Sequence, residues 1–135
     1  MSAVATTIRV RYSECDPMGI AHHTAYATWF EIGRTELLRA DGVRYRDLEA
    51  AGIFLAVLDL SISYKRPARY DDELTLRTWI ADVSRVRLVH EYELLRQAER
   101  LATGRTTLVC IGKDGRARPI PDEVLEVARG RLVKK

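Results

Sequence analysis

The stretch TAYATWFEIGRTELLRA, residues 24–40, decides the fold, because it predicts a long helix that is apolar around much of its circumference. Its apolar face consists of residues at three- and four-residue spacing, which share one side of a helix: Tyr26, Phe30, Gly33 and Leu37. Trp29 and Ile32 widen this face. Thr24 suits the N-cap position, and Gly42 suits the residue that stops the helix. So wide an apolar face predicts a helix that other elements cover.

Polar residues of the same helix indicate which side is expected to face solvent. Arg34, Thr35 and Arg39 lie mostly opposite the apolar face. Glu36 falls near the apolar face, where a carboxylate is unusual. We therefore expect Glu36 to pair with an arginine across the core or across an interface.

On both sides of this helix, apolar residues alternate with polar ones, which predicts strands. The expected strands are 7–12, 54–64, 74–80, 85–96 and 102–111, and the expected short helices are 44–51 and 121–130. The connections at 71–72, 82–84 and 97–100 are short, which favours antiparallel pairing. One long helix cannot cover both faces of five strands. The economical arrangement is an α+β fold, an antiparallel five-stranded sheet wrapped around one long central helix, with the other sheet face or an edge strand used for self-association.

The size and composition of the chain predict a single folded domain over residues 1–135. Hydrophobic residues make up 47% and charged residues 30%, a balance typical of folded proteins. No apolar run approaches the ~20 residues that a membrane helix needs, so no membrane span is expected. Residues 1–7 lack the basic start and apolar core of a signal peptide, and we therefore expect a cytoplasmic protein.

The remaining counts exclude several classes of site. The two cysteines, Cys15 and Cys110, are too few and too far apart for a disulfide framework or a zinc site. With only three histidines, a histidine-rich metal site is not expected either. The net charge of +3 fits a weak attraction to anionic ligands and does not predict nucleic-acid binding.

The segment YSECDPMGIAHHTAY, residues 12–26, joins the first strand to the long helix. A tyrosine at the end of the strand is followed by Asp16, by Gly19 three residues later, and by His23 and Tyr26 as the helix opens. This spacing resembles the signature of the 4-hydroxybenzoyl-CoA thioesterase family. The sequence also resembles this family at 30–36, 64–68, 71–73 and 84–85, so that the resemblance covers about residues 7–127.

The resemblance implies a hotdog fold, an acyl-CoA substrate and hydrolysis of its thioester bond. It also implies active sites at the interface of a homodimer, often within a homotetramer. Coenzyme A is then part of the substrate, and no separate cofactor or metal is expected.

Thioester hydrolysis needs a group that attacks the carbonyl or activates water, and donors for the developing oxyanion. Asp16 stands just before the helix in a loop shaped by Pro17 and Gly19, and it can serve as a nucleophile or as a general base. The residue pattern alone fits a turn aspartate equally well; the resemblance favours catalysis. Glu31 is the alternative carboxylate, because a related hotdog branch uses a helix carboxylate. A nucleophilic Cys15 is not expected, since no Cys–His motif supports it.

The start of the long helix supplies backbone N–H groups near His22, His23 and Thr24 that can hold an oxyanion. His23 matches a family position occupied by His or Tyr. It is expected either to orient the acyl group or water, or only to pack at the helix entry, whereas His22 is expected to be a bystander. Gly19 permits close approach of the chain to the ligand, and Tyr26 is grouped with it as a substrate contact.

Basic residues are the candidates for binding the phosphates of coenzyme A, because arginine matches phosphate with two parallel donors. Arg85 is the first candidate, since it stands where the family places phosphate-binding residues. Lys65 and Arg66 follow it, ahead of Arg69 and Arg87. The alternative is that these charges only solvate a surface.

Two other functions remain open at this point. One is a hotdog hydratase or dehydratase, whose Asp–His spacing differs from the motif found here. The other is a non-catalytic acyl-binding or dimerisation module, against which the intact Asp16 argues. Release of free thiol from acyl-CoA substrates discriminates among all three.

Overall fold

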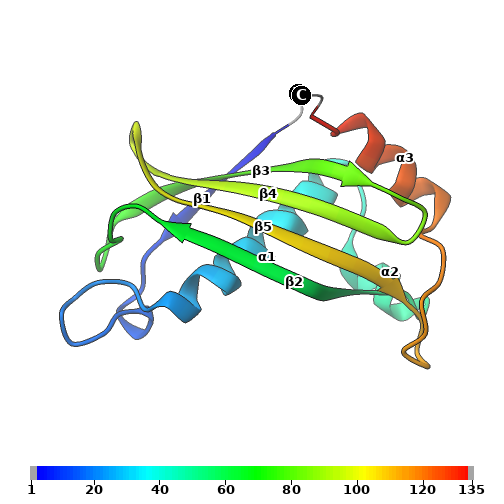
Figure 1. The fold of residues 1–135 in the computed structure, drawn as a ribbon, viewed down its shortest axis with the longest axis horizontal. Helices are drawn as coiled ribbons and strands as arrows, with labels where there is room; N and C mark the ends of the chain where they lie inside the picture. Colours follow the sequence, from blue (N-terminus) through cyan, green and yellow to red (C-terminus); the bar gives the residue numbers. More distant parts are fainter. Residues whose placement is uncertain (1–2, 134–135) are drawn as a thin grey trace.

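The computed structural model describes residues 3–133, and in it an antiparallel sheet curves around one long helix (Figure 1). The elements follow in the order β1 Val4–Arg9, α1 His23–Ala40, α2 Tyr45–Ala50, β2 Phe54–Tyr64, β3 Glu73–Val83, β4 Arg87–Arg96, β5 Glu99–Ile111 and α3 Asp122–Gly130, with a 3₁₀ turn at Tyr12–Glu14. The predicted α+β fold is therefore confirmed. None of the helices in the described part of the chain is long and apolar enough to cross a membrane.

The five strands are arranged in the order β1-β3-β4-β5-β2, so that β1 and β2 form the two edges of the sheet. Every neighbouring pair is antiparallel. The pairing of β2 with β5 shifts register between Val57 and Asp59. This bulge leaves Val57 opposite the buried Leu108 and Leu60 opposite the buried Thr106. Both β2 side chains therefore face the same side of the sheet as helix α1.

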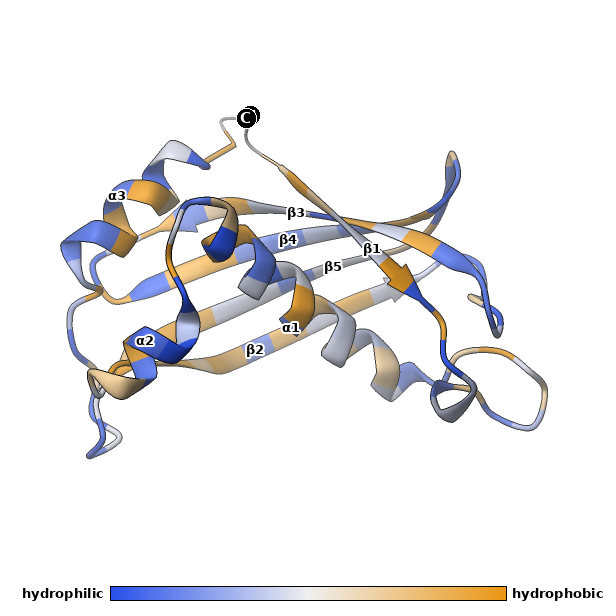
Figure 2. Ribbon diagram, turned by 180° about the vertical axis from the view of Figure 1, so that it is seen from behind, coloured by the Kyte–Doolittle hydropathy of each residue, from blue (hydrophilic) through white to orange (hydrophobic). Residues whose placement is uncertain are grey.

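Helix α1 crosses the inner face of the sheet and packs mainly against β3 and β1 (Figure 2). Gly33 makes this approach possible, because a Cβ there would lie 2.4 Å from Thr78 Oγ1 and 2.7 Å from Leu76 Cδ2. Phe30 stacks on Tyr92 with ring centroids 4.2 Å apart. The predicted apolar face of Tyr26, Phe30, Gly33 and Leu37 is buried, and so is Trp29.

Three expectations for this helix are wrong in detail. Ile32 is 37% exposed, because the helix leaves this side uncovered. The N-cap is His22 and not Thr24, since the His22 ring accepts a hydrogen bond from Thr24 N at 3.3 Å. Glu36 pairs with Arg39, one turn along the same helix, and not across the core or an interface.

The element boundaries agree best in the middle of the chain. The expected strand 54–64 coincides with β2, and the expected final helix begins one residue late, at Asp122. The first strand runs over Val4–Arg9 instead of 7–12, because the chain turns into the 3₁₀ segment Tyr12–Glu14. Helices α2 and α3 close the end of the molecule at which α1 ends, around a second apolar cluster of Leu38, Leu48, Leu88, Cys110, Ile120, Val124, Leu125 and Ala128.

Candidate active site

Asp16 lies in a short loop that folds back on itself between the 3₁₀ turn and helix α1. Cys15 and Ala21 form an antiparallel bridge across the base of this loop. Asp16 N donates to Ile20 O at 3.0 Å, and Gly19 N donates to Asp16 O at 2.9 Å. Gly19 has φ +80°, a conformation that glycine adopts without strain. The Asp-Pro-x-Gly sequence thus forms a tight turn that holds the backbone of Asp16.

The Asp16 side chain is only partly engaged. Its Oδ1 accepts a hydrogen bond from Met18 N at 2.8 Å, which fixes the rotamer of the carboxylate. Among the described residues, no hydrogen bond or ion pair occupies Oδ2, and the residue is half-buried. One carboxylate oxygen is therefore held by the loop while the other remains available to a ligand.

The start of helix α1 lies directly after this loop and leaves one donor open. His22 N donates to Glu14 O at 2.7 Å, and Ala25 N donates to His22 O at 3.0 Å. The His22 ring accepts from Thr24 N. Within residues 3–133, no hydrogen bond takes up the N–H of His23. His22, expected to be a bystander, is therefore the residue that caps the helix and leaves the neighbouring N–H free.

Glu14 anchors the loop to the helix beneath it. Its carboxylate, 8% exposed, accepts hydrogen bonds from Arg11 N at 2.8 Å and from Trp29 Nε1 at 2.9 Å. Burial raises the pKa of Glu14, but the hydrogen bonds from Arg11 and Trp29 outweigh it and hold the pKa below its ordinary value. Glu14 is thus a carboxylate at neutral pH, tied to both sides of the joint between loop and helix.

A hollow of about 310 Å³, here called the helix-entry hollow, opens beside the start of α1. Its wall consists of Ile20, Ala21, His23, Tyr26, Tyr64, Lys65, Arg66 and Pro67. Four predicted site residues, His23, Tyr26, Lys65 and Arg66, therefore come together although about 40 residues separate the two halves of the wall. Ala21 N donates to Ala68 O at 2.7 Å and joins these halves. Asp16 and Gly19 border the hollow through the same loop without lining it.

Three of these four side chains already contact other protein groups, and Lys65 is one of them, since its Nζ donates a hydrogen bond to Ser63 Oγ at 3.3 Å. Tyr26 is 2% exposed and meets the ring of Tyr64 edge-on, with centroids 4.9 Å apart. Burial raises its pKa, and the Tyr26 hydroxyl is neutral at pH 7. Arg66 pairs with Glu99 at 3.1 Å. Tyr26 can therefore offer a ligand only a small part of its ring.

Arg85, the first candidate for a phosphate, lies at the other end of the sheet. It follows β3, whose beginning at Glu73 pairs with Arg9 near the Asp16 loop. The ten residue steps from Glu73 to Val83 span about 33 Å. A single chain therefore does not bring Arg85 to Asp16, and the two can serve one substrate only if Arg85 comes from another subunit.

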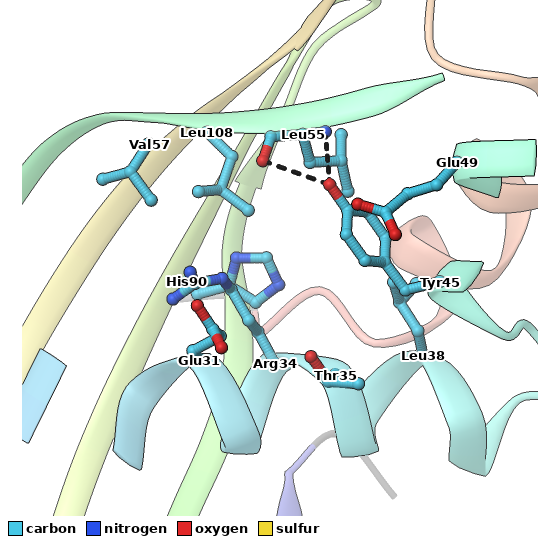
Figure 3. Close-up of a pocket in the computed structure, with 10 residues that line it drawn as sticks. All are labelled: Glu31, Arg34, Thr35, Leu38, Tyr45, Glu49, Leu55, Val57, His90 and Leu108. Carbon is cyan, nitrogen blue, oxygen red and sulfur yellow. Dashed lines mark hydrogen bonds between the residues drawn. The ribbon is translucent and has the colours of Figure 1, made fainter. Parts of the chain in front are cut away.

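Sequence reasoning missed a second polar cluster, formed by Glu31, Arg34 and His90 around a cavity beside the middle of α1 (Figure 3). Arg34 was expected opposite the buried face; instead it lines this cavity. Glu31, the alternative catalytic carboxylate, is exposed and also lies here, away from the helix start. His90 shares one face of its strand with Leu88 and Tyr92, so the alternation of the sequence could have predicted that its side chain faces the core. The described residues contain no group of three or more side chains suited to hold a metal ion.

Comparison with known proteins places this geometry in a family. The family model described as the Thioesterase-like superfamily matches residues 10–127. The acyl-CoA thioester hydrolase YbgC of Escherichia coli O157:H7 is 33% identical over 101 residues, covering 70% of this chain and 75% of the relative.

Solved structures agree with this assignment. The hypothetical protein TT1821 from Thermus thermophilus has a TM-score of 0.91 and 33% identity, covering 98% of this chain and 99% of its own. The DHNA-CoA thioesterase from Staphylococcus aureus has a TM-score of 0.83 and 39% identity, covering 89% of this chain and 80% of its own. The predicted family and the predicted hotdog fold are thereby confirmed.

Proposed function

The chain belongs to the Thioesterase-like superfamily, and from this premise we propose that it hydrolyses acyl-CoA thioesters to a free acid and coenzyme A. The names of the relatives support the substrate class, since YbgC is an acyl-CoA thioester hydrolase and the Staphylococcus aureus protein is a thioesterase that acts on DHNA-CoA. The observation that carries the proposal is the pairing of a half-free carboxylate, Asp16, with the free N–H of His23 across one short loop.

Asp16 is the proposed catalytic residue, with two chemically balanced routes. As a nucleophile, Asp16 attacks the thioester carbonyl, the thiolate of coenzyme A leaves, and water cleaves the resulting mixed anhydride. As a general base, Asp16 accepts a proton from water while that water attacks the carbonyl. The hydrogen bond from Met18 N holds Oδ1, and Oδ2 is the oxygen proposed to react in either route.

The proposed oxyanion donor is the N–H of His23 at the start of α1. The N-terminus of a helix carries about half a positive charge, which favours a negative oxygen placed beside it. A backbone donor is set by the fold and does not need to reorganise as charge develops. The side chain of His23 lines the helix-entry hollow and is proposed to contact the acyl group or the attacking water.

The proposed active unit is a homodimer formed through the edge strand β2. Within the described chain, this strand pairs only with β5, and it exposes Val57, Leu58, Leu60 and Tyr64. A long apolar edge strand favours pairing with a second copy. Antiparallel pairing of two β2 strands would bring the helix-entry hollow of one subunit toward the middle of α1 in the other.

Replacing Asp16 with asparagine tests the proposed chemistry. We expect Asp16→Asn to lower kcat for acyl-CoA hydrolysis by about 100-fold or more with the melting temperature nearly unchanged, because asparagine keeps the hydrogen bond from Met18 N but is neither a nucleophile nor a base. Asp114 is a matched control, since its Oδ1 accepts from Arg116 N at 3.0 Å in the same two-residue pattern. Asp114→Asn should leave kcat unchanged. Near-normal hydrolysis by Asp16→Asn would remove Asp16 from the mechanism.

Isotope labelling separates the two routes in the unmodified protein. In ¹⁸O-labelled water, repeated turnover through an anhydride places label in the Asp16 carboxylate, whereas a general base leaves label only in the product acid. Mass spectrometry of the peptide containing residues 12–26 reads the difference.

A further inference from the structure

The Asp16 loop is paired along one side with residues 67–72, the connection between β2 and β3, here called the supporting segment. Three consecutive loop residues pair with three consecutive residues of this segment in antiparallel register: Gly19 with Tyr70, Ile20 with Arg69, and Ala21 with Ala68. Gly19 and Ile20 are also the two residues whose backbone groups hydrogen-bond to the backbone of Asp16. The supporting segment therefore holds the very residues that hold Asp16.

Asp72 closes the supporting segment into a tight turn. Its Oδ2 accepts a hydrogen bond from Arg69 N at 2.9 Å, and Asp72 N donates to Arg69 O at 3.1 Å. Asp71, within the same turn, has φ +67°, a left-handed conformation that a residue other than glycine keeps only where its surroundings hold it. The backbone of Arg69, which pairs with Ile20, thus depends on the position of the Asp72 carboxylate.

Arg96, at the end of β4, connects the two ends of the supporting segment. Its Nη1 donates to Asp72 Oδ2 at 2.7 Å and to Pro67 O at 3.3 Å. Its Nη2 donates to Glu99 Oε1 at 2.7 Å. The turn between β4 and β5, the supporting segment and the Asp16 loop all lie at the same end of the molecule (Figure 1). Contacts from two nitrogens match the planar guanidinium better than the single ammonium of lysine.

The contact between Arg96 and Asp72 is an ion pair at neutral pH. Burial raises the pKa of Asp72, but the hydrogen bonds from Arg69 N and Arg96 outweigh it and hold the pKa below its ordinary value. Hydrogen bonds to Glu99 and Asp72 raise the pKa of Arg96. The two side chains are 29% and 23% exposed, so water screens the pair only in part. Loss of Arg96 leaves a partly buried carboxylate without its ion-pair partner.

We propose that Arg96 is a positioning residue of the active site, which holds Asp16 in place through Asp72 and the supporting segment. The proposal rests on the proposed thioesterase function and adds to it a residue that is not part of the wall of the helix-entry hollow. A displacement of about 1 Å in a reacting group lowers a rate by up to about 100-fold, so support at this distance can control turnover.

A double-mutant cycle with Asp16 separates positioning from general stabilisation. The substrate is whichever of acetyl-, octanoyl- and benzoyl-CoA the unmodified protein hydrolyses fastest. Arg96→Met keeps the length of the side chain without its donors and should lower kcat about tenfold, measured well below the melting temperature. In the Asp16→Asn background the same change should lower kcat less than about twofold, because the carboxylate that Arg96 positions is already gone. An equal factor in both backgrounds would overturn the proposal.

Backbone hydrogen exchange, followed by mass spectrometry, tests the support of the loop independently of activity. In Arg96→Met, the amides of residues 16–22 and 67–72 should exchange at least about fivefold faster than in the unmodified protein. The reason is that the hydrogen bonds from Asp16 N to Ile20 O and from Tyr70 N to Gly19 O should open more often. Unchanged exchange in both segments would overturn the proposal, even if kcat falls.

Arg131→Met is the matched control for the loss of a partly buried ion pair. Arg131 pairs with Asp41 at 2.8 Å, at the opposite end of α1 from the Asp16 loop, and the two side chains are 16% and 19% exposed. This change should lower the melting temperature by a comparable amount while kcat and the exchange of residues 16–22 stay as they are. Losses as large as those of Arg96→Met would show that the loop responds to any destabilisation, which would overturn the proposal.

A second variant and a second readout keep the test decisive. Should Arg96→Met fail to fold, Asp72→Asn takes its place in both measurements with the same expected directions, because asparagine keeps an acceptor for Arg69 N but removes the ion pair. If the unmodified protein hydrolyses none of the three acyl-CoA substrates, or if Asp16→Asn hydrolyses them normally, the proposed function or its proposed catalytic residue is rejected. Hydrogen exchange then decides by itself whether Arg96 holds the Asp16 loop.

Discussion

Replacing Trp29 with phenylalanine removes one hydrogen-bond donor from the joint between the Asp16 loop and helix α1. Trp29 Nε1 donates to the Glu14 carboxylate at 2.9 Å, and that carboxylate is 8% exposed. A hydrogen bond to a charged group contributes about 1.5–3 kcal/mol. Because phenylalanine retains most of the buried ring, we expect the free energy of unfolding to fall by about 2–3 kcal/mol, which lowers the melting temperature by about 6–12 °C.

The loss of unfolding free energy in Trp29→Phe should depend on pH, because the pKa of Glu14 is lowered in the folded protein. Burial raises this pKa, and the hydrogen bonds from Arg11 and Trp29 more than offset the effect. The stabilisation is therefore fully present above the ordinary value of 4.5 and is lost as the pH falls through the lower, folded value. The melting temperatures of Trp29→Phe and the unmodified protein should converge between pH 7 and pH 3.

Denaturation at pH 7 and pH 3, combined with kcat, measures both consequences. Trp79→Phe is the matched control, since Trp79 Nε1 donates to Glu91 at 3.1 Å on the outer face of the sheet, away from the Asp16 loop. The Glu91 side chain is 20% exposed and also pairs with Arg105, so the control should lose less stability and keep its kcat. Trp29→Phe should lower kcat several-fold by loosening the loop. A stability loss that is the same at both pH values, or an unchanged kcat, would refute the reasoning.

Two further predictions concern assembly and coenzyme A. Leu60→Glu places a charge near the middle of β2 and should shift a dimer toward monomers in light scattering, whereas Ser61→Glu on the outer face should not; equal behaviour of the two would argue against pairing through β2. Arg85→Ala should raise KM for acyl-CoA more than it lowers kcat. The increase in KM should disappear when the substrate is an acyl-pantetheine, which lacks the nucleotide phosphates. Arg87→Ala serves as the neighbouring control. An equal penalty on the truncated substrate would assign Arg85 a structural role.

The elements that could be predicted from the sequence are those with a regular period and one buried face. Strand β2 was expected at 54–64 and is found there, because alternation continues through the bulge with only one residue displaced. The cap of α1 was misplaced by two residues, since threonine is a common cap residue while here the His22 ring accepts the hydrogen bond from Thr24 N. Ile32 fits the helical period but faces the uncovered side, a fact that depends on where the sheet lies.

Part of the candidate site could be predicted from the family resemblance and not from the periodicity of the sequence. The grouping of His23 and Tyr26 with Lys65 and Arg66 came from the family resemblance, because no periodicity relates segments about 40 residues apart. Arg34 was assigned to the polar side of α1 because helical spacing places it mostly opposite the apolar face. The polar side instead borders a cavity, which a helical projection of a single element does not show.

The position of α1 on the sheet determines which part of the inner face stays uncovered. Gly33 lets the helix settle onto Thr78 and Leu76 of β3, close to the β1 edge. The same displacement uncovers the inner face of β2 at the opposite edge, where the apolar side chains Val57 and Leu60 remain half-exposed. Apolar surface of this kind is stabilised when it is removed from water, whether by an acyl chain or by a second subunit. Since Leu60 lies near the middle of β2, we expect an acyl chain and a partner subunit to share this apolar stripe, each covering the part that the other leaves exposed.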